Sequence, residues 1–183
     1  GEYSADLAAR ALSAFLGWND APAGPDLTDA PALPARPPVL CAGCPHRASF
    51  YAVKQAMKGR KAVFCGDIGC YTLGNAMPLD MVDTCLCMGA GITMAQGFFH
   101  TDPAQTCFAF VGDSTFFASG MTGVVNALYN EADLVLCILD NATTAMTGHQ
   151  PHPGTGRNMM DHIVDKVDLA AVLRGMGVRS VET

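Results

Sequence analysis

The fold is decided by two pieces of sequence, Val111-Gly112-Asp113-Ser114 and, after a gap of twenty-five residues, Asp140-Asn141-Ala142-Thr143-Thr144-Ala145-Met146-Thr147-Gly148-His149-Gln150. Each piece reads as the end of a strand followed by a turn, and the residues between them read as a helical connection. Two parallel strands joined by a helix would bring the turns side by side at the carboxyl edge of a sheet, where open α/β folds bind their ligands. The sequence therefore predicts an α/β fold with a ligand site at this edge.

The side chains delivered to that edge are oxygen donors. Asp113 and Asn141 offer a carboxylate and an amide oxygen, which suit a hard cation such as magnesium. The plain alternative for Asp113 is a helix cap after a strand, but the interval to Asn141 favours the metal-ligand interpretation. Since magnesium at such an edge most often carries a phosphorylated ligand, we expect a magnesium-diphosphate site.

Composition limits the classes of partner. The chain has 183 residues, half of them apolar, which is enough for one core of ordinary size. Its net charge of -6 and the lack of a basic stripe argue against nucleic acid, because binding to the phosphate backbone depends on clustered Lys and Arg. The longest apolar run, Cys85 to Met94, is shorter than the roughly 20 residues that span a bilayer. We therefore expect neither nucleic acid nor a membrane as a partner.

The cysteines indicate a reducing environment. Of the eight, Cys65, Cys107 and Cys137 lie inside apolar runs, where small buried thiols are common. Charges at Glu2 and Asp6 are unlike a signal peptide. The expected location is the cytoplasm.

Three parts follow one another along the chain. Residues 1–17 carry apolar residues at helical spacing before Gly17, and we assign this helix to a preceding segment. Residues 18–38 contain six prolines among Ala and Asp, which predicts a semi-extended linker. Residues 39–183 form the folded domain.

Within that domain the pattern alternates between strands and helices. Strands are predicted at residues 61–65, 82–86, 107–111 and 134–139, and a last one opens at Val178. Helices are predicted at residues 48–57, with Pro45 at the first helical position, at 116–129, and after the cap Asp168 as far as Gly175 or Gly177. This order predicts a parallel sheet with helices on both faces.

The two pieces quoted first resemble the diphosphate-binding signature of thiamine diphosphate enzymes. Ser114 stands where that signature has a third-position Gly, and Asp140 stands where it has a first Asn, but both side-chain metal ligands are kept. By five ordered motifs, the chain resembles the large subunit of indolepyruvate:ferredoxin oxidoreductase from about residue 39 onward. These motifs are Cys41 to Arg47, Gly66 to Thr72, Asp83 to Ala90, Gly112 to Phe117 and Thr144 to Gln150. The resemblance implies the thiamine diphosphate-binding fold for residues 39–183.

The resemblance also implies a reaction. Thiamine diphosphate would attack the keto carbon of an aryl pyruvate, carbon dioxide would leave, electrons would pass through iron-sulfur clusters to ferredoxin, and the acyl group would go to coenzyme A. The glutamate that activates the aminopyrimidine lies on a second domain or subunit in such enzymes. We therefore expect the chain to be inactive alone and to work within an oligomer.

Individual site residues follow from the same resemblance. Asp113 and Asn141 would bind magnesium through their side chains and Thr143 through its backbone carbonyl. The remaining predicted cofactor-binding residues are Gly112, Ser114, Thr147, Gly148 and Gln150 around the diphosphate, Gly89 and Ala90 near the thiazolium, and His46. His149 is a candidate acid-base group because its ordinary pKa lies near neutrality. His152 and His162 are interpreted as surface histidines.

Three cysteines match part of a cluster motif. In the wider family of 2-oxoacid:ferredoxin oxidoreductases, a CxxC, a later Cys in a Gly-rich turn and a fourth Cys beyond the diphosphate loop hold a [4Fe-4S] cluster. Cys41, Cys44 and Cys70 match the first three, but no cysteine follows Cys137. Zinc, a cluster completed by another ligand such as Cys85 or Cys87, and free thiols are all open.

Two other functions remain as alternatives. One is a subunit of a non-oxidative thiamine-dependent decarboxylase acting on small sulfonated or phosphonated pyruvates, which would not need the cysteines. The other is a structural module in which the CxxC is half of a zinc site.

Overall fold

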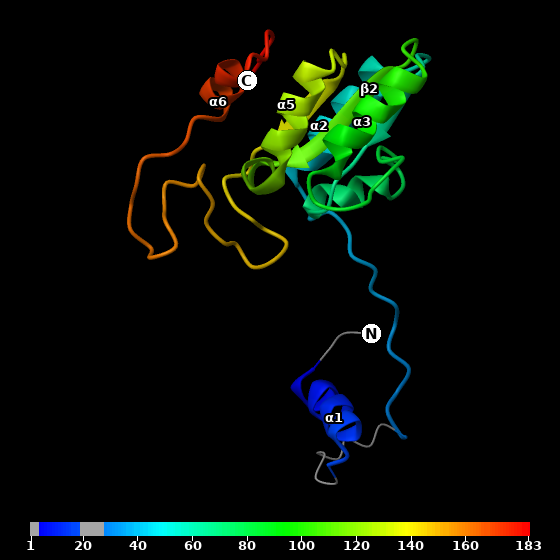
Figure 1. Ribbon diagram of the computed structural model, residues 1–183. Coiled ribbons are helices and arrows are strands. Elements are labelled where there is room, and N and C mark those ends of the chain that lie inside the picture. Colours follow the sequence, from blue (N-terminus) through cyan, green and yellow to red (C-terminus); the bar gives the residue numbers. More distant parts are fainter. Residues whose placement is uncertain (1–3, 19–27) are drawn as a thin grey trace. The chain divides into compact units, whose positions relative to one another are not determined.

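The computed structural model describes residues 4–18 and 28–183 and divides the chain into two compact units, residues 1–37 and 38–183 (Figure 1). The first unit contains the predicted amino-terminal helix, α1 (Ala5–Leu16). The Ser4 side chain accepts a hydrogen bond from the Leu7 amide, and Gly17 ends the helix with φ of 70°. Residues 19–27 of the predicted linker lie outside the described residues.

The second unit is built on a parallel sheet of three strands. These are β1 (Ala62–Cys65), β2 (Thr106–Gly112) and β3 (Val135–Leu139), in the order β1-β2-β3. Cys107 pairs with Val63 on one side, and Gly112 pairs with Leu139 on the other. Three of the predicted strands are thereby confirmed.

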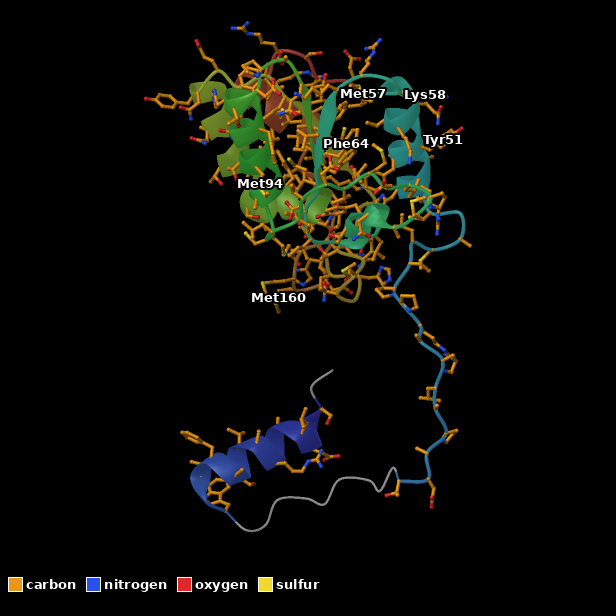
Figure 2. The ribbon with its side chains drawn as sticks, turned by 90° about the vertical axis from the view of Figure 1, so that its right-hand side faces the viewer. Tyr51, Met57, Lys58, Phe64, Met94 and Met160 are labelled. Carbon is orange, nitrogen blue, oxygen red and sulfur yellow. The ribbon has the colours of Figure 1, made fainter. Side chains whose placement is uncertain are left out.

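Both faces of the sheet are covered by helices, as predicted. Cys107, Ala109 and Val111 of β2 join one core cluster, which includes residues of α3 (Ala90–Thr101) and α5 (Met121–Tyr129). Phe108 and Phe110 point the other way and pack with residues of α2 (Pro45–Ala56) and the 3₁₀ helix η1 (Cys70–Asn75). In Figure 2, Met94 on α3 and Tyr51 on α2 lie on opposite sides of Phe64 in the sheet.

The crossover from β2 to β3 begins directly at the signature Asp113. A short helix α4 (Asp113–Thr115) continues into a π-helical segment η2 (Phe116–Gly120) and then into α5. Such π segments are frequent near functional sites. The first turn of the signature is therefore also the start of a helix.

Two of the predicted strands are wrong. Residues 82–86 form only an isolated bridge, between Thr84 and Cys65. The Asp83 carboxylate accepts the Phe64 amide at 2.8 Å, so a side chain takes the place of a main-chain partner and the ladder does not extend. Residues 178–183 contain no strand.

The last helix, α6 (Leu169–Met176), lies beyond a long loop. The Asp168 side chain caps it by accepting from the Ala171 amide at 2.9 Å, and Gly177 ends it. Leu169, Val172 and Leu173 pack against the cluster that α3 and α5 share. A cavity of about 790 Å³ lies beside β3, lined among others by α5 and α6. Across the described ranges, no helix is long and apolar enough to cross a bilayer.

Candidate functional site

The two signature turns meet where β2 and β3 end. Gly112 and Leu139 are paired in the sheet, so Asp113 and Asp140 each follow a neighbouring strand end. The Thr144 hydroxyl donates a hydrogen bond to Ser114 Oγ at 2.7 Å and ties the second turn to the first. The predicted juxtaposition of the turns is confirmed. Ser114, which departs from the glycine of the family signature, supplies this link.

Asp113 is a buried carboxylate with few compensating partners. Its side chain is 3% exposed; Oδ1 accepts the Ser114 amide at 2.8 Å, and Oδ2 lies 3.0 Å from His152 Nε2. Burial raises the pKa of Asp113, the Ser114 amide lowers it, and the nearby Asp140 carboxylate raises it further. A nearby cation would stabilise the ionised form of this carboxyl group.

His152 is buried, so the interpretation of this residue as a surface histidine is wrong. The residue is 8% exposed and its ring lies 5.9 Å from the ring of Phe117, between centroids. Its backbone carbonyl accepts from the Thr155 amide at 2.9 Å, which closes a turn from His152 to Thr155. The sequence signal was the Pro-His-Pro-Gly run, a rigid turn. His162 is exposed, as predicted.

A cavity of about 90 Å³ lies between the two turns. Seven of the predicted cofactor-binding residues line it, namely His46, Gly112, Asp113, Ser114, Asn141, Thr143 and Thr147. Gly89, Ala90, Gly148 and Gln150 are not among its lining residues, although Met88 is. The cavity thus gathers the proposed metal ligands from both turns.

Tyr71 forms the wall behind the first turn and was missed from sequence. Its hydroxyl donates to the Ile68 carbonyl at 3.0 Å and lies 3.2 Å from Thr115 Oγ1. A Cβ atom on Gly112 would lie 2.6 Å from Tyr71 Cε1. The first glycine of the signature is therefore required by the ring packed against it.

The second turn is held in shape by its own polar side chains. Asn141 is exposed, and its Oδ1 accepts the Thr143 amide at 3.3 Å. Thr147 and Gln150 are joined by two hydrogen bonds of 2.6 Å, and Thr144 bridges to Gln150. Because this loop is closed on itself, its polar groups stay near the mouth of the cavity.

The start of α3 is held by a carboxylate that sequence reasoning also missed. Asp67 is fully buried, and its two oxygens accept the amides of Ile68 and Gly89, each at 2.6 Å. Burial raises the pKa of Asp67, while the amides of Ile68, Gly89 and Gly91 lower it. The Gly89 amide, predicted near the thiazolium, is thus occupied by Asp67.

His46 and the three motif cysteines share the region where α2 begins. Burial lowers the pKa of His46, which lines the cavity between the turns. The pKa of Cys70 is raised by burial first and then by the neighbouring Cys44 and Cys41 thiols. All eight cysteines are free, and no group of three His, Cys, Asp or Glu side chains in residues 4–18 and 28–183 is arranged to hold a metal. The predicted cluster remains a prediction.

The donor set between the turns fits magnesium. Asp113 brings a carboxylate, Asn141 an amide oxygen and Thr143 a backbone carbonyl, and hard cations prefer oxygen ligands. Within the described residues, neither Lys nor Arg is a hydrogen-bond partner of the buried Asp113 carboxylate. A divalent cation would supply the missing charge, and a phosphorylated ligand would follow it.

This geometry agrees with a comparison against protein families. Residues 67–183 match the family described as thiamine pyrophosphate enzyme, C-terminal TPP binding domain. The chain belongs to this family. As a thiamine pyrophosphate enzyme domain, it has the α/β fold predicted from its sequence.

Curated relatives of this thiamine pyrophosphate enzyme domain carry a common name. The chain is 43% identical over 187 residues to indolepyruvate oxidoreductase subunit IorA of Methanothermobacter marburgensis, and the match covers 100% of the chain and 30% of the relative. It is 49% identical over 150 residues to the IorA subunit of Archaeoglobus fulgidus, covering 81% and 24% respectively. The chain therefore spans less than a third of these relatives.

A solved structure shares the fold. The 2-oxoglutarate:ferredoxin oxidoreductase from Magnetococcus marinus, with 2-oxoglutarate, coenzyme A and succinyl-CoA bound, superposes with a TM-score of 0.63 at 19% identity. The match covers 78% of this chain and 52% of that one. At this identity the likeness concerns the fold alone.

Proposed function

We propose that this chain is the part of an oxidoreductase that binds thiamine diphosphate and magnesium, and that the whole enzyme oxidatively decarboxylates aryl pyruvates such as indolepyruvate to acyl-CoA, with ferredoxin as acceptor. The observation that carries this proposal is the cavity that both Asp113 and Asn141 line. The family match and the names of the relatives support the same assignment.

In this proposal the two turns divide the work of binding. Asp113, Asn141 and the Thr143 carbonyl would hold magnesium, whose charge would attract the diphosphate. Ser114, Thr147, Gly148 and Gln150 would orient the diphosphate from the rim, while Gly112 leaves the room that the Tyr71 ring needs behind the first turn. Thiamine diphosphate supplies the carbanion chemistry when it is bound.

The remaining predicted residues would surround the thiazolium ring of the cofactor. Gly89 and Ala90 lie at the start of α3, where Asp67 fixes the backbone. His46 is buried with a lowered pKa, so it is neutral near pH 7 and offers one donor and one acceptor. We assign it to contact with the cofactor rather than to proton transfer.

The activity needs parts that this chain does not carry. We propose that a second domain or subunit supplies the glutamate facing the aminopyrimidine, and that the assembly is an oligomer using coenzyme A. The relatives are named as one subunit of an oxidoreductase and are more than three times longer than the matched region. Cys41, Cys44 and Cys70 remain the candidate ligands of a [4Fe-4S] cluster that would carry electrons to ferredoxin.

Titration of thiamine diphosphate and magnesium into the assembled enzyme by calorimetry tests the binding part. Replacing Asp113 by Ala is expected to weaken binding at least 100-fold, because it removes a charged metal ligand. Asp161→Ala is the matched control, since that carboxylate is 85% exposed and distant in sequence from both turns. Equal binding by the Asp113→Ala variant and the wild type would contradict the assignment.

The product tests the reaction. With indolepyruvate, coenzyme A and an artificial one-electron acceptor, the assembly is expected to yield an acyl-CoA and two reduced acceptors per carbon dioxide. Release of an aldehyde without acceptor reduction would establish the non-oxidative decarboxylase instead.

A further inference from the structure

His152 reaches the first signature turn from a loop that follows the second one. Its Nε2 lies 3.0 Å from Asp113 Oδ2, and the two side chains are only 4% and 3% exposed. The two residues are 39 positions apart in sequence. This contact therefore depends on the tertiary fold, and it is shielded from water.

The partners of the imidazole assign its tautomer. The Gly154 amide donates to Nδ1 at 3.2 Å, so Nδ1 carries a lone pair. Nε2 then carries the proton and donates it to Asp113 Oδ2. Since the Ser114 amide donates to Oδ1, each oxygen of Asp113 receives one hydrogen bond and the plane of the carboxylate is fixed.

The ring itself has little freedom to move. Thr155 holds the His152 carbonyl with its amide at 2.9 Å and its hydroxyl at 2.8 Å. A Cβ atom on Gly154 would lie 3.1 Å from His152 Cε1 and 3.3 Å from Phe117 Cε2, so the loop passes close over both rings. The contact to Asp113 is thus held from both sides of the imidazole.

A purely structural role explains less of this arrangement. A phenyl ring would fill the same space, whereas both nitrogens of His152 are paired and one points at the carboxylate of the signature. Carboxylates that bind metals are commonly oriented by such outer partners, and loss of the partner costs roughly 10- to 100-fold in metal affinity.

We propose that His152 is a positioning residue of the magnesium-diphosphate site, which orients Asp113 through a neutral Nε2–H donor. This inference rests on the proposed function, because it concerns the same cation. It extends the site by a residue outside the signature and makes the Pro151–Thr155 turn part of the cofactor-binding structure.

Binding of Mn²⁺ with thiamine diphosphate, followed by electron paramagnetic resonance in the assembled enzyme, tests the proposal without relying on turnover. His152→Phe keeps the ring and removes both nitrogens, so the apparent Kd for Mn²⁺ is expected to rise 10- to 100-fold. His152→Gln keeps an N–H donor and is expected to recover most of that loss. His162→Phe is the control and leaves the Kd unchanged, because His162 is exposed.

The kinetic pattern separates positioning from catalysis. Saturating cofactor is expected to restore the kcat of His152→Phe, since His152 acts on binding through Asp113. A wild-type Kd in His152→Phe, or a Gln variant no better than the Phe variant at equal Tm, would overturn the proposal.

Two further outcomes have defined meanings. If His152→Phe fails to fold, ¹⁵N spectra of the wild-type 183-residue chain decide: a protonated Nε2 supports the proposal, and a protonated Nδ1 overturns it. If the wild-type assembly binds no Mn²⁺ with thiamine diphosphate, the proposed function fails and this inference fails with it.

Discussion

Tyr71 leaves no space for a side chain at Gly112. Because its ring is buried and its hydroxyl is held by the Ile68 carbonyl and Thr115, it cannot move aside easily. The backbone of Gly112 has φ of -80°, which any residue adopts, so only the clash matters. Gly112→Ala is expected to lower the free energy of unfolding by about 1–3 kcal/mol, measured by urea denaturation.

A second glycine gives the matched control for that measurement. Gly97 lies in the exposed part of α3, and a Cβ atom there would meet nothing within 4 Å. Gly97→Ala is expected to raise the free energy of unfolding by about 0.5–1 kcal/mol. If both variants were equally stable, the account of Tyr71 would be wrong.

Cys137 gives a prediction that depends on pH. Burial raises its pKa to about 11, so the neutral thiol is favoured and the reactive thiolate appears only as the pH rises. At pH 8 roughly one thiol in a thousand would be ionised. Alkylation of the folded chain by iodoacetamide, followed by mass spectrometry, is expected to modify the exposed Cys41 first and to speed up about tenfold per pH unit at Cys137. Equal rates for the two cysteines at pH 8 would contradict this.

At the scale of elements, the start of α3 depends on Asp67. Asp67→Ala would leave the part-buried amide of Ile68 and the buried amide of Gly89 without acceptors. Such a loss costs about 1–3 kcal/mol at a buried amide and less at a part-buried one, so we expect the free energy of unfolding to fall by about 2–4 kcal/mol. Asp133→Ala, at an exposed position without a positive φ, is expected to change it by less than about 0.5 kcal/mol. Urea denaturation of both variants makes the comparison, and similar losses would refute the role of Asp67.

The strands and loops also show which features the sequence pattern can predict and which it cannot. The strands β2 and β3 were predictable because continuous apolar stretches between turns are typical of parallel strands, although only β2 is buried along almost its whole length. The strand expected at residues 82–86 failed because the Asp83 side chain replaces a main-chain acceptor. His152 and Asp67 were missed for a related reason: each has a partner that is distant in sequence, Asp113 and Gly89 respectively, and periodicity carries no information about such contacts.

At the scale of the whole molecule, the two compact units differ in what stabilises them. The core clusters of the described residues contain nothing before Leu40. Removing residues 1–37 is therefore expected to leave the Tm of the remainder within about 2 °C of the full chain, by differential scanning calorimetry.

A slightly longer truncation serves as its control. Removing residues 1–40 also deletes Leu40, which is 5% exposed and whose carbonyl accepts from Arg47. Losing a buried Leu costs about 2–5 kcal/mol, so the Tm should fall by several degrees. A similar fall in the first truncation would mean that residues 1–37 support the domain.

The outer side of β3 affects how this chain behaves at high concentration. Within residues 28–183, no strand pairs with that side of Val135–Leu139, and Val135 is 43% exposed. A short apolar strand with unpaired amides and carbonyls is a template onto which another chain can add. Val135→Lys is therefore expected to raise the concentration at which the purified polypeptide stays in solution, because a charge on an edge strand opposes the addition of another strand.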